Sequence, residues 1–297
     1  MAFKKIKIAV LMYGQIRTGI YCAPWIKSWF SMPTHITIPL YKQRISNYNE
    51  LLQPEICQVE VDYFLDLKDK NTYANSTGVD SPDIDIQKII DLYQPKKFNI
   101  TSIDEELNWK TTNGLQNYAS MFNSIRTCLR LKQQSELESG ELYNFCFTHR
   151  YDAINGPDIN SFRTKLTTTG FPPLTIISPH RGMSRWPWEN WRMGPNDTFF
   201  GGDNLAVEIL MAEVSKILFV NNNLFVSAGE WQGPNVILGR AINNSSLEYQ
   251  EDMNFFTAMV RPNADLTKDV FESWTYHQEF WVRNHAALAQ DKKILMQ

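Results

Sequence analysis

This sequence of 297 residues has few cysteines, little net charge and no long apolar runs. Its four cysteines include no Cys-x-x-Cys pair and have no histidine at metal-site spacing, which favours reduced thiols over a disulfide scaffold or a zinc site. A net charge of -3 gives no overall attraction to nucleic acid, so such a contact would need a local patch. Because the apolar runs are too short for a signal sequence or a membrane span, we expect a cytoplasmic protein without membrane insertion.

The glycine-rich motifs that bind phosphate are also missing. The sequence contains no G-x-G-x-x-G motif and no P-loop, so the dinucleotide-binding and NTPase classes lack their required signatures. It shows no internal repeat and no low-complexity tract. With 43% hydrophobic residues the chain can bury a large core, and we expect a single domain over residues 1–297.

Strand and helix patterns alternate along the chain. Short apolar runs that end in polar residues predict buried strands over 6–13 and 143–148. Apolar residues at helical spacing predict a helix over 112–139, and a shorter helix ends at Tyr93 with Asp83 as its expected N-cap. This alternation predicts an α/β fold, a Rossmann-type α/β/α sandwich with a mostly parallel sheet whose ligands gather at the carboxyl ends of the strands.

A guanidinium and a carboxylate follow the second of these strands, at Arg150 and Asp152. An arginine can grip phosphate through its planar fork, and an aspartate can hold a divalent cation, Mn²⁺ or Mg²⁺, that bridges two phosphates. The pair therefore suits a diphosphate, with Asp152 as the metal ligand. An Arg–Asp ion pair that only closes a strand end is an alternative of equal weight.

The loop after the first strand reads Gly14-Gln15-Ile16-Arg17. Gly14 lets the backbone approach a ligand, Gln15 offers an amide to a base or ribose, and Arg17 offers a second guanidinium to phosphate. The motif is weak by itself. It lies at a strand end, as Arg150 does, and the two segments together indicate a phosphate-containing ligand.

Asn196 and Asp197 precede the run Phe199-Phe200-Gly201-Gly202. A carboxylate here could act as a general base if it lies within hydrogen-bond reach of an acceptor hydroxyl. Turn and N-cap chemistry is the alternative, because Asn, Asp and Gly all favour turns. Glu230, in a polar turn after an apolar run, is a second candidate base.

Aromatic and cationic side chains are interleaved in the stretch from His180 to Arg192. Aromatic faces bind sugars and stack nucleic-acid bases, and arginines bind phosphate. Tryptophans buried in a core are the alternative, but the stretch has neither strand nor helix periodicity. We therefore expect an acceptor-binding platform or lid formed by Arg185, Trp186, Trp188, Trp191 and Arg192.

Taken together, these segments resemble the bacterial and viral GT-A-like glycosyltransferases, including polysaccharide and lipopolysaccharide enzymes of the WavE-like type. The resemblance spans residues 6–211 and depends on the order of four motifs, which are Gly14-Gln15-Ile16-Arg17, Ser120-Met121-Phe122-Asn123-Ser124-Ile125, Arg150-Tyr151-Asp152 and Asn196-Asp197-Thr198-Phe199-Phe200-Gly201. It implies transfer of a sugar from a nucleoside diphosphate sugar, expected to be a uridine one, to an acceptor hydroxyl. Residues 1–155 would form the donor half and residues 156–297 the acceptor half.

The resemblance also implies roles for individual residues. Asp152 takes the place of the family's Asp-x-Asp metal motif, but Arg150 occupies the first acidic position of that motif. A single carboxylate makes a weaker cation site, so Arg150 would supply part of the phosphate neutralisation. Asn196 would face the donor sugar, and Asp197 or Glu230 would be the base.

Three other functions fit parts of the sequence. A phage enzyme that glycosylates hydroxymethylated cytosine in DNA would explain the Trp/Arg stretch, because extruding a base requires aromatic stacking. A non-catalytic carbohydrate-binding module would also use an aromatic platform, but it needs no diphosphate grip. A nucleotidyltransferase would release pyrophosphate rather than a nucleoside diphosphate.

Overall fold

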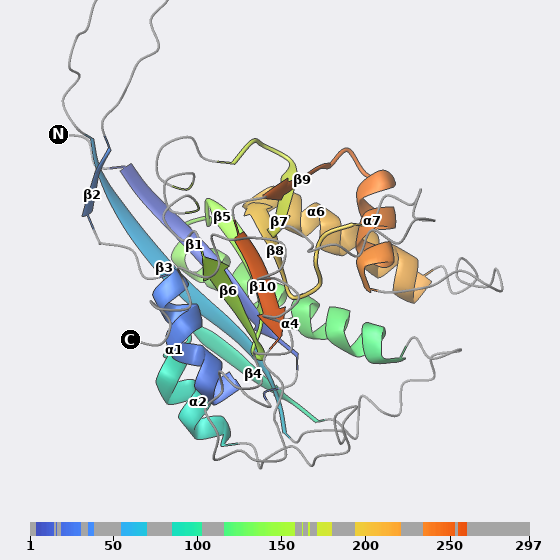
Figure 1. Ribbon diagram of the computed structural model, residues 1–297, viewed down its shortest axis with the longest axis horizontal. Coiled ribbons are helices and arrows are strands. Elements are labelled where there is room, and N and C mark those ends of the chain that lie inside the picture. Colours follow the sequence, from blue (N-terminus) through green and yellow to red (C-terminus); the bar gives the residue numbers. More distant parts are fainter. Residues whose placement is uncertain are drawn as a thin grey trace, which may run out of the picture.

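A central mixed sheet organises the computed structural model of the protein (Figure 1). The structure describes residues 4–14, 16, 19–30, 35–38, 55–69, 85–102, 116–157, 162, 166, 171–179, 194–220, 234–252 and 255–259. The strands of the sheet follow the order β2-β3-β1-β5-β8-β7-β9, and β4 pairs with β3 beside this path. Their bounds are β1 (Lys4–Tyr13), β2 (His35–Ile38), β3 (Glu55–Lys68), β4 (Lys97–Thr101), β5 (Phe145–Arg150), β7 (Thr175–Pro179), β8 (Phe199–Asp203) and β9 (Glu248–Asp252).

The pairs β1–β3, β1–β5, β3–β4 and β7–β9 are parallel, whereas β2–β3, β5–β8 and β7–β8 are antiparallel. β1 lies inside the sheet because its side chains from Ile8 to Tyr13 are apolar on both faces and have no exposed surface. The predicted strands over 6–13 and 143–148 are thereby confirmed as β1 and β5.

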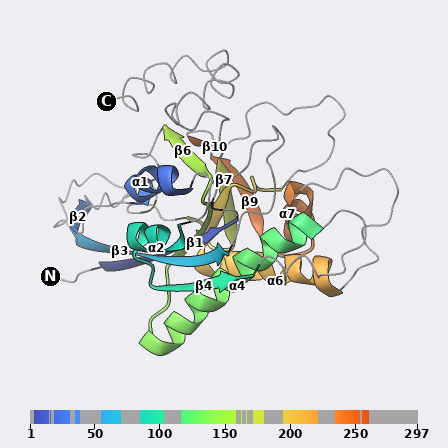
Figure 2. The ribbon, with the colours of Figure 1, turned by 90° about the horizontal axis from the view of Figure 1, so that it is seen from below.

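Helices cover both faces of the sheet, so the predicted α/β/α sandwich is confirmed (Figure 2). One face carries α1 and α2, and the other carries α4, α6 and α7. Their bounds are α1 (Gly19–Phe30), α2 (Ile86–Tyr93), α4 (Gln116–Ser139), α6 (Asn204–Ser215), which a π-helical turn η2 (Lys216–Val220) extends, and α7 (Pro234–Asn243). Among these described helices, none has both the length and the apolar composition to cross a bilayer.

The N-cap of α2 is Asp85, and the expected cap at Asp83 is wrong. The carboxylate of Asp85 accepts a hydrogen bond of 2.8 Å from the backbone N–H of Lys88, which is the geometry of a helix N-cap. Both aspartates precede the same apolar pattern, so the sequence alone did not distinguish them.

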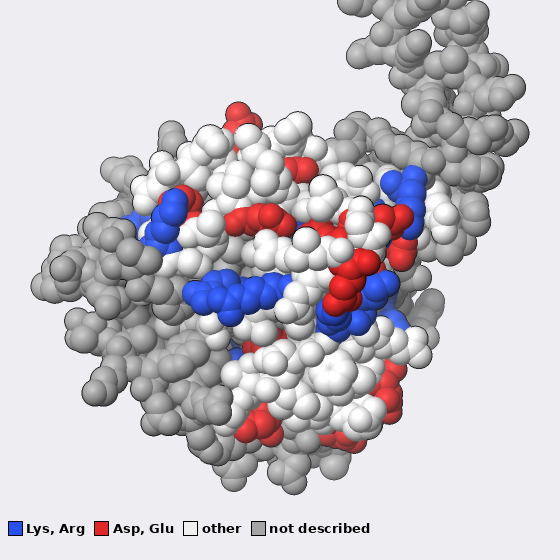
Figure 3. All heavy atoms as spheres, turned by 180° about the vertical axis from the view of Figure 1, so that it is seen from behind, with Lys and Arg blue, Asp and Glu red and all other residues white. Residues whose placement is uncertain are grey.

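Charges of both signs are mixed on the molecular surface. Figure 3 shows a face on which Lys and Arg side chains lie among Asp and Glu side chains. Several such charges form ion pairs. Nζ of Lys5 lies 3.1 Å from Oε2 of Glu60 and 3.0 Å from Oε2 of Glu141, and Nζ of Lys97 lies 2.6 Å from Oε1 of Glu138. Exposed pairs of this kind contribute little to stability, but they neutralise the local field.

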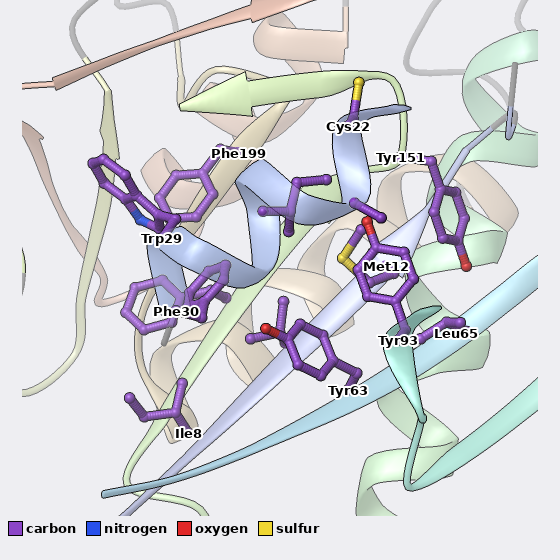
Figure 4. Packing of buried hydrophobic residues seen from close by; sticks show 14 of the residues in the cluster. Ile8, Met12, Cys22, Trp29, Phe30, Tyr63, Leu65, Tyr93, Tyr151 and Phe199 are labelled. Carbon is purple, nitrogen blue, oxygen red and sulfur yellow. The ribbon is translucent and has the colours of Figure 1, made fainter. Parts of the chain in front are cut away.

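Aromatic side chains fill the core between α1 and the sheet (Figure 4). The ring centroids of Phe30 and Phe147 are 6.0 Å apart, and those of Phe147 and Phe199 are 5.7 Å apart with nearly parallel planes. Because Phe147 belongs to β5 and Phe199 to β8, these contacts fix the two strands against α1. The candidate site lies where these two strands meet.

Two glycines allow β8 to lie between β5 and β7. A Cβ on Gly201 would be 2.4 Å from the carbonyl oxygen of Cys146, and one on Gly202 would be 2.3 Å from that of Thr175. Gly202 also has a φ of +151°, which favours glycine. β8 was not predicted from the sequence, because a pair of glycines is typical of a turn.

A two-stranded ribbon begins directly after Asp152. Its strands, β6 (Ala153–Pro157) and β10 (Phe255–Met259), pair antiparallel. Figures 1 and 2 together show the ribbon on the face of the main sheet that carries α1. Asp152 therefore lies at the junction between the end of β5 and this ribbon.

Candidate functional site

Three strands meet at one edge of the sheet, where β1 and β5 end and β8 begins. Tyr13, the last residue of β1, pairs in parallel register with Arg150, the last residue of β5. His149 pairs with Phe199 across the antiparallel β5–β8 ladder, so the residues just before β8 lie at the same edge. This register brings together Tyr13, Gly14, Arg150, Asp152 and Asp197, of which all but Tyr13 were predicted site residues.

Gly14 begins the loop after β1. Its φ of +92° lies in a region that residues with a side chain rarely adopt, which explains the glycine. A Cβ there would be 3.9 Å from Cγ of Arg150, so the loop passes close to that side chain.

Arg150 and Asp152 form a bidentate ion pair. Nε of Arg150 donates to Oδ1 of Asp152 at 2.8 Å, and Nη2 donates to Oδ2 at 2.9 Å. The Asp152 side chain is fully buried and that of Arg150 is 15% exposed. Burial alone would lower the pKa of the Arg150 guanidinium, but the charges of Asp152 and Asp197 raise it above its usual value. The guanidinium is therefore a fixed positive charge whose fork already binds a carboxylate.

Asp197 supplies a second carboxylate to the same guanidinium. Its Oδ2 lies 3.8 Å from Nη1 of Arg150, the nitrogen that the Asp152 pair does not use. The side chain of Asp197 is 23% exposed, in contrast to that of Asp152. Two carboxylates next to one guanidinium leave this cluster with an excess of negative charge.

The segment Gly194–Thr198, which we call the Asp197 loop, is held by main-chain hydrogen bonds. The backbone N–H of Asp197 donates to Oδ1 of Asn235 at 3.2 Å, and its carbonyl accepts from the hydroxyl of Tyr13. Burial, and next the negative charge of Asp197, raise the pKa of Tyr13 well above its usual value, so this hydroxyl keeps its proton.

Asn196 shapes the turn that precedes β8. Its Oδ1 accepts hydrogen bonds from the backbone N–H of Thr198 at 3.0 Å and from the Thr198 hydroxyl at 2.8 Å. The backbone N–H of Asn196 donates to the hydroxyl of Ser178 at 3.3 Å. This is the turn chemistry that was the alternative for Asn196. Contact of Asn196 with a donor sugar stays a prediction.

The amino end of α1 points toward the same edge. A Cβ on Gly19, the first residue of this helix, would be 3.1 Å from Cβ of Tyr151, which lies between Arg150 and Asp152 in the chain. Helix amino ends carry partial positive charge and unpaired N–H groups that favour anions. The helix end therefore adds positive potential beside the negative cluster.

The described residues do not fit a metal ion as they stand. Both oxygens of Asp152 accept hydrogen bonds from Arg150, so a cation at Asp152 would have to displace the guanidinium fork. Within the described part of the chain, no group of three His, Cys, Asp or Glu side chains is placed to hold a metal. Metal binding by Asp152 stays a prediction.

A second buried carboxylate, Asp66, lies near the end of β3 and was not predicted from the sequence. Asp66 is fully buried and accepts hydrogen bonds from the side chains of four residues at 2.6–3.0 Å, which are Lys68, Asn99, Thr101 and Ser124. Ser124 belongs to the helix motif Ser120–Ile125, so this part of the motif joins α4 to β3. Because Asp66 is saturated with donors, we interpret this carboxylate as structural.

Several predicted site residues lie outside the described part of the chain. They are Gln15 and Arg17 of the first loop, the second candidate base Glu230, and the acceptor platform of Arg185, Trp186, Trp188, Trp191 and Arg192. Their roles stay predictions. Tyr13 and Asn235, in contrast, contact the Asp197 loop and were not predicted, because nothing in the local sequence shows which loop a strand end or a helix start will touch.

Comparisons with known proteins add little to this picture. No protein-family model and no curated protein matches the sequence. The apo form of the glycosyltransferase GlyE of Streptococcus pneumoniae TIGR4 matches at a TM-score of 0.34 and 9% identity, over 84% of this chain. The chain spans about half of that protein, 46% of its length.

Two other solved structures match over most of both chains. A proposed glucose-1-phosphate thymidylyltransferase of Bacillus anthracis, in complex with a sucrose, has a TM-score of 0.37 and 8% identity and covers 90% of this chain and 93% of its own. The nucleoside-diphosphate-sugar pyrophosphorylase of Vibrio cholerae RC9 has a TM-score of 0.30 and 10% identity, with 84% and 93% covered. TM-scores this low carry no argument about function.

Proposed function

We propose that this protein is a glycosyltransferase that moves a sugar from a nucleoside diphosphate sugar, with uridine as the expected base, to an acceptor hydroxyl. The convergence of Gly14, Arg150 and Asp197 on one sheet edge supports this most strongly. Open α/β sheets bind ligands at such carboxyl edges. Here a guanidinium suited to phosphate adjoins a partly exposed carboxylate suited to a hydroxyl.

In the proposed reaction, Asp197 takes the proton of the acceptor hydroxyl. The acceptor oxygen forms a bond to the anomeric carbon of the sugar, and the bond from that carbon to the diphosphate breaks. The nucleoside diphosphate leaves with the electron pair, and its developing charge is stabilised by Arg150 through Nη1. The proton remains on the Asp197 carboxylate until solvent removes it.

The donor needs more positive charge than Arg150 provides, because Asp152 and Asp197 already surround that guanidinium. The amino end of α1 supplies part of it, and Arg17 is the predicted second phosphate ligand. A divalent cation, Mn²⁺ or Mg²⁺, would supply the rest if Asp152 left the fork of Arg150.

The acceptor is a glycan or, in the alternative, a hydroxymethylated cytosine of phage DNA. Both would use the Trp/Arg stretch, and the salt dependence of binding distinguishes them. A DNA acceptor predicts duplex binding that weakens steeply with salt, because phosphate contacts release counterions. Glycan binding predicts little dependence on salt.

Product analysis tests the proposed function. We expect the purified protein, incubated with uridine diphosphate sugars, to release uridine diphosphate by transfer or slow hydrolysis. Asp197→Asn should lower this rate on the order of 10²–10⁴-fold, the usual contribution of a general base. Asp203→Asn, at the opposite end of β8, is the matched control and should keep the wild-type rate.

Two outcomes would contradict the proposal. The first, in a parallel incubation with a nucleoside triphosphate and a sugar phosphate, contradicts it as a whole, and the second contradicts only its choice of base. Release of pyrophosphate from a nucleoside triphosphate and a sugar phosphate would make the protein a nucleotidyltransferase. Near-normal turnover by Asp197→Asn would remove Asp197 as the base and leave Glu230 as the candidate.

A further inference from the structure

Asn235 contacts the Asp197 loop at two of its residues. It is the second residue of α7, and its side-chain Oδ1 accepts the N–H of Asp197 at 3.2 Å. Its backbone carbonyl accepts the N–H of Gly194 at 3.0 Å. One residue of α7 thus binds both the first residue of the loop and the candidate base.

The loop and α7 also touch through their backbones. A Cβ on Gly194 would lie 2.0 Å from the backbone nitrogen of Gly239 and 2.4 Å from its Cα, so only glycine fits at residue 194. Gly239 lies in the same helix as Asn235 and is buried. With no side chain between them, the loop cannot shift toward α7, and the two bonds to Asn235 oppose a shift away from it.

The remaining main-chain groups of the loop are held as well. Tyr13 donates its hydroxyl to the carbonyl of Asp197, and the backbone N–H of Arg150 donates to the carbonyl of Thr198 at 3.0 Å. The carboxylate of Asp197 is therefore carried by a backbone fixed on the side of β1 and β5 and, through Asn235, on the side of α7.

We infer that Asn235 is a positioning residue, which sets the place of the Asp197 carboxylate next to Arg150. This inference rests on the proposed function, because it assigns Asn235 a role only through the base Asp197. A small displacement of a general base lowers the turnover rate rather than the affinity for the donor. A misplacement of about 1 Å can lower that rate about 10²-fold. Loss of the Asn235 bond should therefore affect turnover and spare donor binding.

The test compares Asn235→Ala, Asn235→Asp and the control Asn243→Ala. Alanine removes the acceptor of the Asp197 N–H, whereas aspartate keeps an acceptor oxygen at the same position. Asn243 is the exposed last residue of α7, so its substitution changes the helix but not the loop. The readouts are amide hydrogen exchange of the loop, the affinity for uridine diphosphate, and the rate of uridine diphosphate release.

We expect Asn235→Ala to speed exchange in the loop several-fold, since a lost hydrogen bond of about 1 kcal/mol corresponds to about a fivefold change. Its kcat should fall about 10–100-fold with KM and nucleotide affinity unchanged. Asn235→Asp should recover most of the rate, and Asn243→Ala should match the wild type.

Wild-type kcat in Asn235→Ala, or no recovery in a folded Asn235→Asp protein, would overturn the inference. A failure of the proposed function looks different, because then the wild-type protein would neither bind nor release nucleotide. In that case the exchange data would still decide whether Asn235 fixes the loop.

Discussion

Arg150 connects two carboxylates that differ in burial. Asp152 has no exposed surface and uses both oxygens in the pair, whereas the Asp197 side chain is partly exposed and lies 3.8 Å away. The same guanidinium therefore holds a fully buried carboxylate and faces a partly exposed one, which is the proposed base. The ion pair that was the alternative interpretation of Arg150 and Asp152 is present, and it does not use Nη1, which faces Asp197.

Removal of one partner of the Arg150–Asp152 ion pair should destabilise the folded protein. We expect Arg150→Met to lower the free energy of unfolding by about 3–5 kcal/mol, because the buried carboxylate of Asp152 loses its partner. The double variant Arg150→Met/Asp152→Leu should recover most of that loss, since no buried charge remains. Chemical denaturation of the wild type and the two variants measures both values. Equal stability of the single and double variants would mean that Asp152 does not depend on Arg150.

At the scale of elements, β8 places the candidate base. It runs antiparallel to β5, so its amino end brings the Asp197 loop to the edge where β5 ends. Its close fit depends on Gly201, where a Cβ would meet the carbonyl oxygen of Cys146 in β5.

Substitution of this glycine should displace β5 or β8. We expect Gly201→Ala to cost about 3 kcal/mol or more, because backbone atoms of a central strand cannot move out of the way. Gly140→Ala is the control: its Cβ would meet nothing within 4 Å, so only its φ of +69° penalises alanine, by about 1–2 kcal/mol. Thermal and denaturant unfolding compare the two. If Gly201→Ala were the milder change, the close contact of β8 with β5 would be in doubt.

The elements differ in how far the sequence predicts them. β1, β5 and α4 follow from apolar runs and helical spacing, and the strand end at Arg150–Asp152 follows with β5. β8 does not, since its glycine pair fits a turn as well as a strand. The partners Tyr13, Asn235 and Asp66 were also missed, because their contacts depend on strand register and helix placement between residues far apart in the chain.

Buried tyrosines link the stability of the folded protein to pH. Burial is the largest cause that raises the pKa of five described residues above the usual value for tyrosine, which are Tyr13, Tyr63, Tyr93, Tyr143 and Tyr151. These phenols stay neutral in the folded protein at a pH where the unfolded chain ionises. Unfolding then releases protons, so stability is intact below about pH 10 and falls as the pH rises further.

We expect a steep alkaline transition. Each buried phenol removes up to about 1.4 kcal/mol per pH unit above about pH 10, so five of them exhaust a typical stability of about 5–15 kcal/mol within about two pH units. Tyrosinate absorbance and circular dichroism, followed together, check this. Full ionisation of the tyrosines while the native dichroism persists would show that they are not buried.

The proposed function requires that the edge formed by β1, β5 and β8 binds a nucleoside diphosphate. This requirement is tested by calorimetric titration with uridine diphosphate, with and without Mn²⁺, on the wild type, Asp197→Asn and Asp203→Asn. We expect wild-type binding, equal or tighter binding by Asp197→Asn because a negative charge near the diphosphate is removed, and unchanged binding by Asp203→Asn. Absence of binding to uridine, guanosine and cytidine diphosphates alike would contradict the proposed function.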